Sequence, residues 1–279
     1  MEQLSIYEQL SFCTARIETE DSGRNTYSGT GFFFSLKVKD KEVPLLVTNK
    51  HVVRGMKKGR FLFTIADADG NPDYVNHFAF DVDGTFETMW KFHPHDDVDL
   101  CVLPIVPLLN AAIAKGKHLF YRTLGEELIP NDTDKSNLDA IEDIIMIGYP
   151  NGLWDQVNNM PIIRKGITAT NVTLDYNGKK EFLIDAACFP GSSGSPVLIC
   201  NVGGYKDKRG NLKWGKSRVF LLGILYAGPQ MQVTGDFQVV TVPDSQQKAV
   251  SVSSIPNNLG FIIKSERLLD LKPMFESLV

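Results

Sequence analysis

Short runs of β-branched and aromatic residues recur along almost the whole chain, and they constrain the fold more than any other feature of its 279 residues. Runs of this kind between Gly, Asn, Asp and Pro are typical of strands joined by tight turns. About a dozen are present: 31–36, 43–48, 60–65, 77–82, 99–105, 143–148, 162–173, 181–185, 196–200, 219–226, 237–242 and 260–263. Helical periodicity is credible only near the start of the chain, over 108–114 and over 265–278. The pattern predicts an all-β protein of antiparallel sandwiches or barrels.

The stretch 125–140 (GEELIPNDTDKSNLDA) is the most polar and turn-rich segment of its length, and it lies near the middle of the chain. Such clusters between patterned segments are typical of loops. We therefore expect two β-rich halves, 1–130 and 141–279, joined by a linker at 131–140. A chain of this length can bury a sizeable core.

Composition excludes several classes of partner. The chain has 33 acidic and 29 basic residues, with a net charge of −4 and no long Lys/Arg block. A nucleic-acid partner, which requires a clustered basic face, is therefore not expected. The longest uncharged stretch, 100–114, is too short to span a bilayer, so no membrane segment is expected either.

The start of the chain and its cysteines favour the cytoplasm. Glu2 and Glu8 precede the first basic residue, Arg16, whereas a signal peptide begins with basic residues. The four cysteines show no CxxC spacing. We expect them to be reduced, buried thiols.

The most unusual local sequence is PGSSGSP, residues 190–196. It can be a plain tight turn. In a chemical interpretation, Ser193 is a nucleophile and the glycines let the chain coil around it. The backbone N–H groups of Gly191 and Ser193 can then converge on a developing oxyanion. The window centred on Ser193 ends in Ser195, so it does not fit a GxSxG elbow.

A serine nucleophile needs a general base, and the chain offers five histidines. His51 directly follows an apolar strand in LLVTNKHVV, where a rigid element can present a side chain at its end. His77 and His118 are expected at the surface. His93 and His95 lie on one extended segment beside Asp96 and Asp97, which does not favour a metal site.

The base must be oriented by a carboxylate, and the candidates are Asp96, Asp97 and Asp99 in HDDVDLCVLPI. Asp99 directly precedes the apolar run, so it is the one expected to be carried toward the interior. Asp96 and Asp97 belong to the turn before it.

Four segments in order resemble the trypsin-like (chymotrypsin-fold) serine peptidases, and among them the bacterial Htr-type branch: SGTGFFF (28–34), TNKHVV (48–53), DLCVL (99–103) and PGSSGSP. His51 lies 48 residues before Asp99, which lies 94 before Ser193. The resemblance implies two packed six-stranded antiparallel β-barrels with a C-terminal helix. His51 and Asp99 belong to the first barrel and Ser193 to the second.

The resemblance also implies a specificity pocket with its floor at Ala187 and its walls at Tyr226, Ala227 and Gly228. An uncharged floor favours small or medium apolar side chains before the scissile bond. In zymogen-type members an aspartate before the nucleophile pairs with a freshly cut N-terminus. Here that residue is Ser192, so activation by N-terminal cleavage is not expected. Ser195 replaces a glycine where little room is usual.

The leading interpretation is a serine endopeptidase that acts on polypeptides without cofactor or metal, restrained by a regulatory partner or by a poorly formed site. An inactive or weakly active scaffold that binds peptides or partner proteins is the alternative. An esterase using the same triad is a third.

Overall fold

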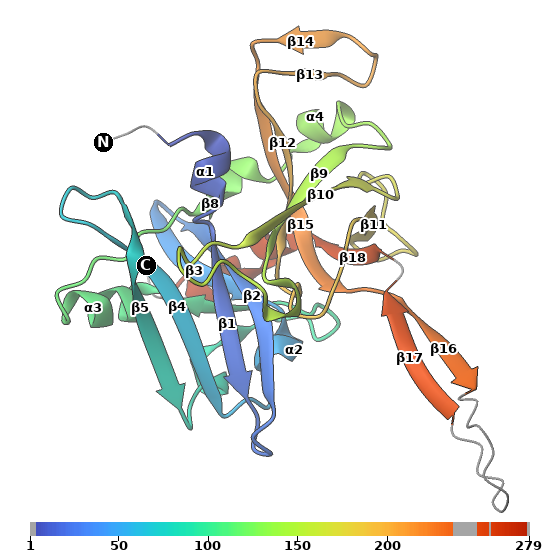
Figure 1. Ribbon diagram of the computed structural model, residues 1–279. Coiled ribbons are helices and arrows are strands. Elements are labelled where there is room, and N and C mark those ends of the chain that lie inside the picture. The colour runs from blue at the N-terminus through green and yellow to red at the C-terminus, as the bar shows by residue number, and fades with distance from the viewer. Residues whose placement is uncertain (1–3, 237–249, 257, 278–279) are drawn as a thin grey trace, which may run out of the picture.

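The structure, a computed structural model, describes residues 4–236, 250–256 and 258–277, and there the chain is mostly β (Figure 1). The strands of the first half are β1 (Thr14–Glu20), β2 (Thr26–Val38), β3 (Lys41–Thr48), β4 (Lys58–Ala66), β5 (Pro72–Asp83), β6 (Lys91–Phe92), β7 (Cys101–Pro104) and β8 (Leu124–Gly125). Those of the second half are β9 (Asp143–Gly148), β10 (Ile162–Thr168), β11 (Glu181–Asp185), β12 (Pro196–Asn201), β13 (Gly204–Lys206), β14 (Leu212–Trp214), β15 (Arg218–Ala227), β16 (Gln230–Asp236), β17 (Val250–Pro256) and β18 (Leu259–Lys264).

The helices are short. The α-helices are α1 (Ile6–Leu10), α2 (Lys50–Val53), α3 (Val106–Ile113) and α4 (Asp132–Ser136). The 3₁₀ helices are η1 (Glu87–Met89), η2 (Glu126–Leu128), η3 (Pro150–Gly152) and η4 (Ser265–Phe275). Helices near the start and over 108–114 were predicted, and both are confirmed. The expected linker at 131–140 contains α4, which Asn131 caps.

The second half contains the expected closed barrel, and its six strands follow the order β10-β11-β18-β15-β12-β9. Two hairpins, β13–β14 and β16–β17, project from it (Figure 1). The strand predicted at 237–242 lies outside the described residues.

The first half is an eight-stranded sheet in which six strands were expected. Its order is β5-β4-β1-β2-β3-β7-β6, and β8 pairs in parallel with β2. Among the described residues β5 and β6 are not hydrogen-bonded to each other, so closure into a barrel is not seen. β6 has only two residues, and both pair with β7.

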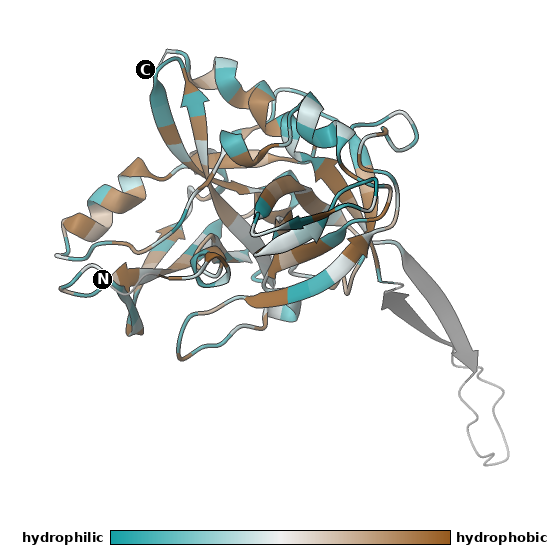
Figure 2. Cartoon of the chain, turned by 90° about the horizontal axis from the view of Figure 1, so that it is seen from above, coloured by the Kyte–Doolittle hydropathy of each residue, from teal (hydrophilic) through white to brown (hydrophobic). Residues whose placement is uncertain are grey.

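Side chains that alternate along the strands divide the interior into separate cores. In β2, Phe33 packs inside the first half, whereas Phe32 and Phe34 face a core shared by both halves. In β9, Met146 packs inside the barrel and Ile145 faces the shared core. Figure 2 shows hydrophobic and hydrophilic residues interspersed along the strands and helices. The shared core holds the two halves together.

The expected C-terminal helix is present as a 3₁₀ helix, η4, and it ends at Phe275. Leu268 and Leu271 are buried in the shared core three residues apart, which matches the period of a 3₁₀ helix. Pro273 lies inside the segment and has no N–H for an α-helical hydrogen bond.

Candidate active site

The PGSSGSP segment coils tightly between β2 and the barrel. Gly191 and Gly194 adopt φ values of +82° and +88°, a region that favours glycine. A Cβ on Gly194 would overlap the carbonyl oxygen of Thr30 and lie 2.6 Å from Thr48 Oγ1. The glycines are therefore required by both conformation and space.

The carbonyl groups of this turn are held in fixed directions, and this orients the N–H groups on the other side of each peptide. The carbonyl of Pro190 accepts from the N–H of Asn151 at 2.6 Å, and that of Ser192 accepts from Ser195 at 3.0 Å. Because a trans peptide places its N–H opposite its carbonyl, the N–H groups of Gly191 and Ser193 point the other way. Within the described part of the chain, neither of these two N–H groups has an acceptor. They are free to bind a ligand oxygen.

Three serines occupy the turn, and only one is accessible. Ser192 and Ser195 are fully buried, whereas Ser193 is partly exposed and lines a cavity. Its Oγ makes no hydrogen bond with any described residue. The carbonyl of Ser193 accepts from the Thr30 N–H at 2.9 Å, which fixes its backbone to β2.

His51 lies in α2, immediately after β3, and both carboxylate oxygens of Asp99 form hydrogen bonds with it. Asp99 Oδ2 lies 2.5 Å from His51 Nδ1, and Oδ1 accepts from the His51 backbone N–H at 3.1 Å. The side chain of His51 is half exposed, and that of Asp99 is 24% exposed. Nδ1 faces the carboxylate, so Nε2 is the nitrogen left for another partner.

Two residues beside His51 secure the segment that carries Asp99, and the sequence interpretation missed both. Asn49 Nδ2 donates to the Asp99 carbonyl at 2.8 Å, and Lys50 Nζ donates to the His95 carbonyl at 2.9 Å. Both side chains are buried, and burial lowers the pKa of Lys50. Their polar character inside an apolar context was the available signal.

Thr30 and Thr48 connect the serine turn with the histidine segment. Thr48 Oγ1 donates to the Thr30 carbonyl at 2.7 Å, and the Thr30 N–H holds Ser193. Thr48 precedes His51 by three residues. The structure thus brings the segments of His51, Asp99 and Ser193 to one region, although no hydrogen bond between His51 and Ser193 is present among the described residues.

The other notable histidine, His93, has a structural role. It is buried, its Nε2 lies 3.0 Å from the Arg267 carbonyl, and its Nδ1 accepts from the His95 N–H. Burial lowers its pKa. It therefore connects the first half to η4.

The family model of the trypsin-like peptidase domain matches residues 29–203, which is more than half of the chain. This chain belongs to the trypsin-like peptidase family. No curated protein matches its sequence.

Several solved structures are distantly similar to this trypsin-like peptidase. Inactive tobacco etch virus protease complexed with substrate is 14% identical, with a TM-score of 0.47 over 98% of this chain and 87% of that one. The thermostable serine protease AL20 from an extremophilic microorganism is 11% identical, with a TM-score of 0.45 over 95% and 98%. The active form of the Rv3671c protease from M. tuberculosis is 15% identical, with a TM-score of 0.43 over 92% and 78%.

A cavity of about 230 Å³ lies beside Ser193 in this peptidase. Its lining is uncharged and consists of Cys188, Phe189, Pro190, Ser193, Leu225, Ala227, Gly228 and Pro229. Of the residues expected at a specificity pocket, Ala227 and Gly228 line it, whereas Ala187 and Tyr226 do not. The Tyr226 hydroxyl instead donates to Glu181 at 3.0 Å. Leu225 and Ala227 both line the cavity, and the pairing of β15 with β18 is irregular at Tyr226 between them, whose side chain reaches Glu181 instead.

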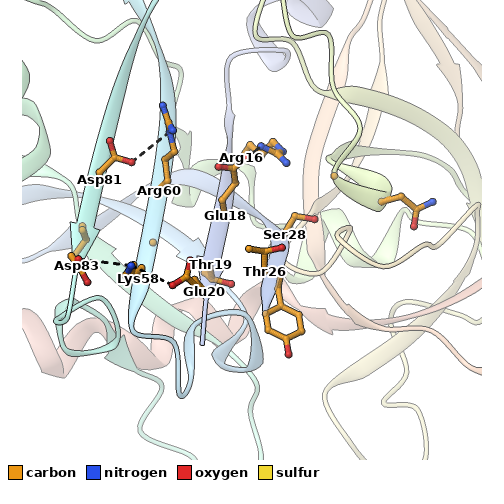
Figure 3. A pocket seen from close by; sticks show the side chains of 15 residues that line it. Arg16, Glu18, Thr19, Glu20, Thr26, Ser28, Lys58, Arg60, Asp81 and Asp83 are labelled. Carbon is orange, nitrogen blue, oxygen red and sulfur yellow. Dashed lines mark hydrogen bonds and ion pairs between the residues drawn. The ribbon is translucent and has the colours of Figure 1, made fainter. Parts of the chain in front are cut away.

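A second and larger cavity, of about 630 Å³, has a mostly polar set of lining residues (Figure 3). Charged side chains from β1, β4 and β5 line it, and Lys58 bridges Glu20 at 3.3 Å and Asp83 at 4.0 Å. Ser28 lines the end of this cavity that adjoins the serine turn, since its Oγ would lie 3.0 Å from a Cβ on Gly191. Ser193 lines the uncharged cavity and Ser28, next to Gly191, lines the polar one, so the serine turn adjoins both cavities.

Ser195, which occupies a position usually taken by glycine, fits because the facing residue of β9 is Gly148. A Cβ on Gly148 would overlap Ser195 Oγ and lie 2.6 Å from Thr30 Oγ1. The extra bulk at residue 195 is accommodated by the missing side chain at 148.

All four cysteines are free and buried, as the sequence predicts. Among the described residues, every helix is too short or too polar to cross a membrane.

Proposed function

We propose that this trypsin-like peptidase is a serine endopeptidase with His51 as general base, Asp99 as its orienting carboxylate and Ser193 as nucleophile. The observation that carries the proposal is the pair of hydrogen bonds between the two carboxylate oxygens of Asp99 and His51. It directs Nδ1 inward and leaves Nε2 for the serine. The backbone N–H groups of Gly191 and Ser193 are assigned to the oxyanion.

In the proposed reaction His51 Nε2 accepts the proton of Ser193 Oγ as that oxygen attacks the carbonyl carbon of the scissile bond. The carbonyl oxygen becomes negative and is bound by the two N–H groups. His51 then returns the proton to the leaving amine, and the acyl group stays on Ser193. Water activated by His51 releases the acid and restores the enzyme.

The two cavities that adjoin the serine turn favour a polypeptide substrate over a small ester. The acyl side of a peptide that reacts at Ser193 would occupy the uncharged cavity beside Ala227. Its leaving side would then pass Ser28 toward the polar cavity. A small ester would use only the first of these. The uncharged lining favours a small or medium apolar side chain immediately before the scissile bond, such as Ala, Val, Leu or Met.

A catalytically weak or inactive scaffold that binds peptides is the second candidate. It is favoured by one observation, the lack of a hydrogen bond from Ser193 Oγ to any described residue. An active endopeptidase is also expected to lack this hydrogen bond without substrate, because catalytic hydrogen bonds often form only once substrate is bound.

The proposal extends to the wider setting of the enzyme. We place it in the bacterial Htr-type branch, in the cytoplasm, with a regulatory protein partner that limits access to the site. The functional units would be 1–130 and 141–279, with Ser193 on the second. The free, buried thiols agree with a reducing compartment.

Incubation with an unfolded polypeptide and with an activated ester distinguishes the candidates. An endopeptidase yields new internal N-termini with wild type and none with His51→Ala or Ser193→Ala, while His118→Ala, an exposed control, stays active. Ester cleavage without peptide cleavage indicates an esterase. Peptide binding without either reaction indicates a scaffold.

A further inference from the structure

One arginine of the barrel contacts both ends of the turn that precedes Ser193. Arg164, on β10, donates to the Ala187 carbonyl and, over 3.0 Å, to Ser192 Oγ. These two acceptors enclose 188–191, the segment that ends at the Gly191 N–H. A planar guanidinium binds two acceptors at a fixed separation, so Arg164 sets the span of the turn.

The charge of Arg164 has no counter-ion across residues 4–236, 250–256 and 258–277. The adjacent Lys165 pairs with Asp143 at 3.0 Å, but no described carboxylate lies within ion-pair distance of Arg164. Its Nε is buried without a partner, and burial lowers its pKa. An unpaired, partly buried cation is costly, and the hydrogen bonds that Arg164 donates to the turn offset part of that cost.

Arg164 lies next to the turn that carries the N–H groups assigned to the oxyanion. It contacts Ser192, the residue between the two N–H groups assigned to the oxyanion. Thr30 holds the turn from the opposite side, through the carbonyls of Gly191 at 3.0 Å and Ser193 at 2.9 Å. The turn is thus fixed between β2 and β10.

We propose that Arg164 is a positioning residue of this enzyme: it holds residues 187–192 so that the Gly191 and Ser193 N–H groups face the substrate, and its charge favours the negative oxygen formed there. The inference rests on the proposed function. A hydrogen bond from β10 holds Ser192, which cannot form a chain-end ion pair.

The kinetic test compares Arg164→Met with Lys165→Met, a matched change at the next residue of β10. In Arg164→Met the Gly191 and Ser193 N–H groups should be displaced from the oxyanion, and this should lower kcat by about 100-fold. KM should stay within about threefold, because the interaction is made in the transition state. A peptide boronic acid, which mimics the tetrahedral state, should lose affinity by a similar factor, while peptide binding in a Ser193→Ala background is unchanged. Equal kcat and boronate affinity in the two variants would overturn the proposal.

Arg164→Lys keeps the charge and loses the paired donors, so it should recover only part of kcat. Full recovery would show that the geometry of the guanidinium is unimportant. If Arg164→Met fails to fold, Ser192→Ala removes one acceptor alone and should lower kcat by about 3- to 10-fold. An unchanged kcat in that variant would contradict the inference.

Hydrogen exchange provides a measurement that does not depend on catalysis. Amides of 186–195 should exchange faster in Arg164→Met than in Lys165→Met, while those of β1 and β4 are unchanged. Equal exchange in the turn overturns the positioning role whether or not the enzyme is active. If the wild type neither cleaves peptides nor reacts with a fluorophosphonate, the proposed function is contradicted. Faster exchange of the turn in Arg164→Met would still support the positioning role.

Discussion

Replacement of Asp99 by asparagine tests how the histidine is oriented. The Asp99 carboxylate makes two contacts, one with the His51 backbone N–H at 3.1 Å and one with Nδ1 at 2.5 Å. An amide can satisfy the first contact only with its oxygen, so its NH₂ group must face Nδ1. Nδ1 must then accept a hydrogen bond from this NH₂ group, so the ring proton moves to Nε2. A protonated Nε2 cannot take the proton of Ser193.

The expected loss in kcat is about 10⁴-fold, the magnitude known for a wrong imidazole tautomer. At 1.36 kcal/mol for each factor of ten, this corresponds to about 5 kcal/mol of transition-state stabilisation. KM should change little, because Asp99 lines neither cavity.

Steady-state kinetics with a peptide substrate measure both constants. Asp96→Asn and Asp97→Asn are the controls, since both side chains are exposed on the same turn. A loss below tenfold in Asp99→Asn would refute this reasoning, and so would an equal loss in either control.

Three further outcomes are expected. Gly148→Ala should lower the free energy of unfolding by about 1–3 kcal/mol through overlap with Ser195, and adding Ser195→Gly should restore part of it; additive losses in urea unfolding would contradict the pairing. Burial opposes ionisation of Glu266, but hydrogen bonds from Lys135 and Lys180 lower its pKa to about 2. Its ionised form therefore stabilises the fold above about pH 4.5, and this stabilisation is lost as the pH falls toward 2. Glu266→Gln should cost about 1–2 kcal/mol at pH 7 and much less near pH 2; a cost independent of pH would exclude this role. In a peptide library, small and medium apolar residues should be preferred before the scissile bond, and a strong preference for Lys or Arg would show that another cavity is used.

Sequence reasoning succeeded where the signal is local. The strand periodicity indicated a mostly β fold, and the glycines of PGSSGSP indicated a tight coil around Ser193. The positions of His51 after one strand and Asp99 before another place both at strand ends, where the structure has them in contact.

Contacts between segments that are far apart in the sequence could not be predicted from such local signals. Gly148 looks like an ordinary glycine in the sequence, and only the structure shows that it makes room for Ser195. Arg164 lies 28 residues before Ser192, and nothing local marks it as a partner of that turn. Closure of the first sheet likewise depends on the pairing of end strands, which strand periodicity does not specify.

Reaction with a fluorophosphonate, followed by mapping of the modified residue, tests the central claim most directly. We expect one label on Ser193, abolished in His51→Ala, because this serine alone of the three in the turn is accessible and lies beside free N–H groups. A label on Ser192 or Ser195, or no label on a folded protein that still binds peptides, would contradict it.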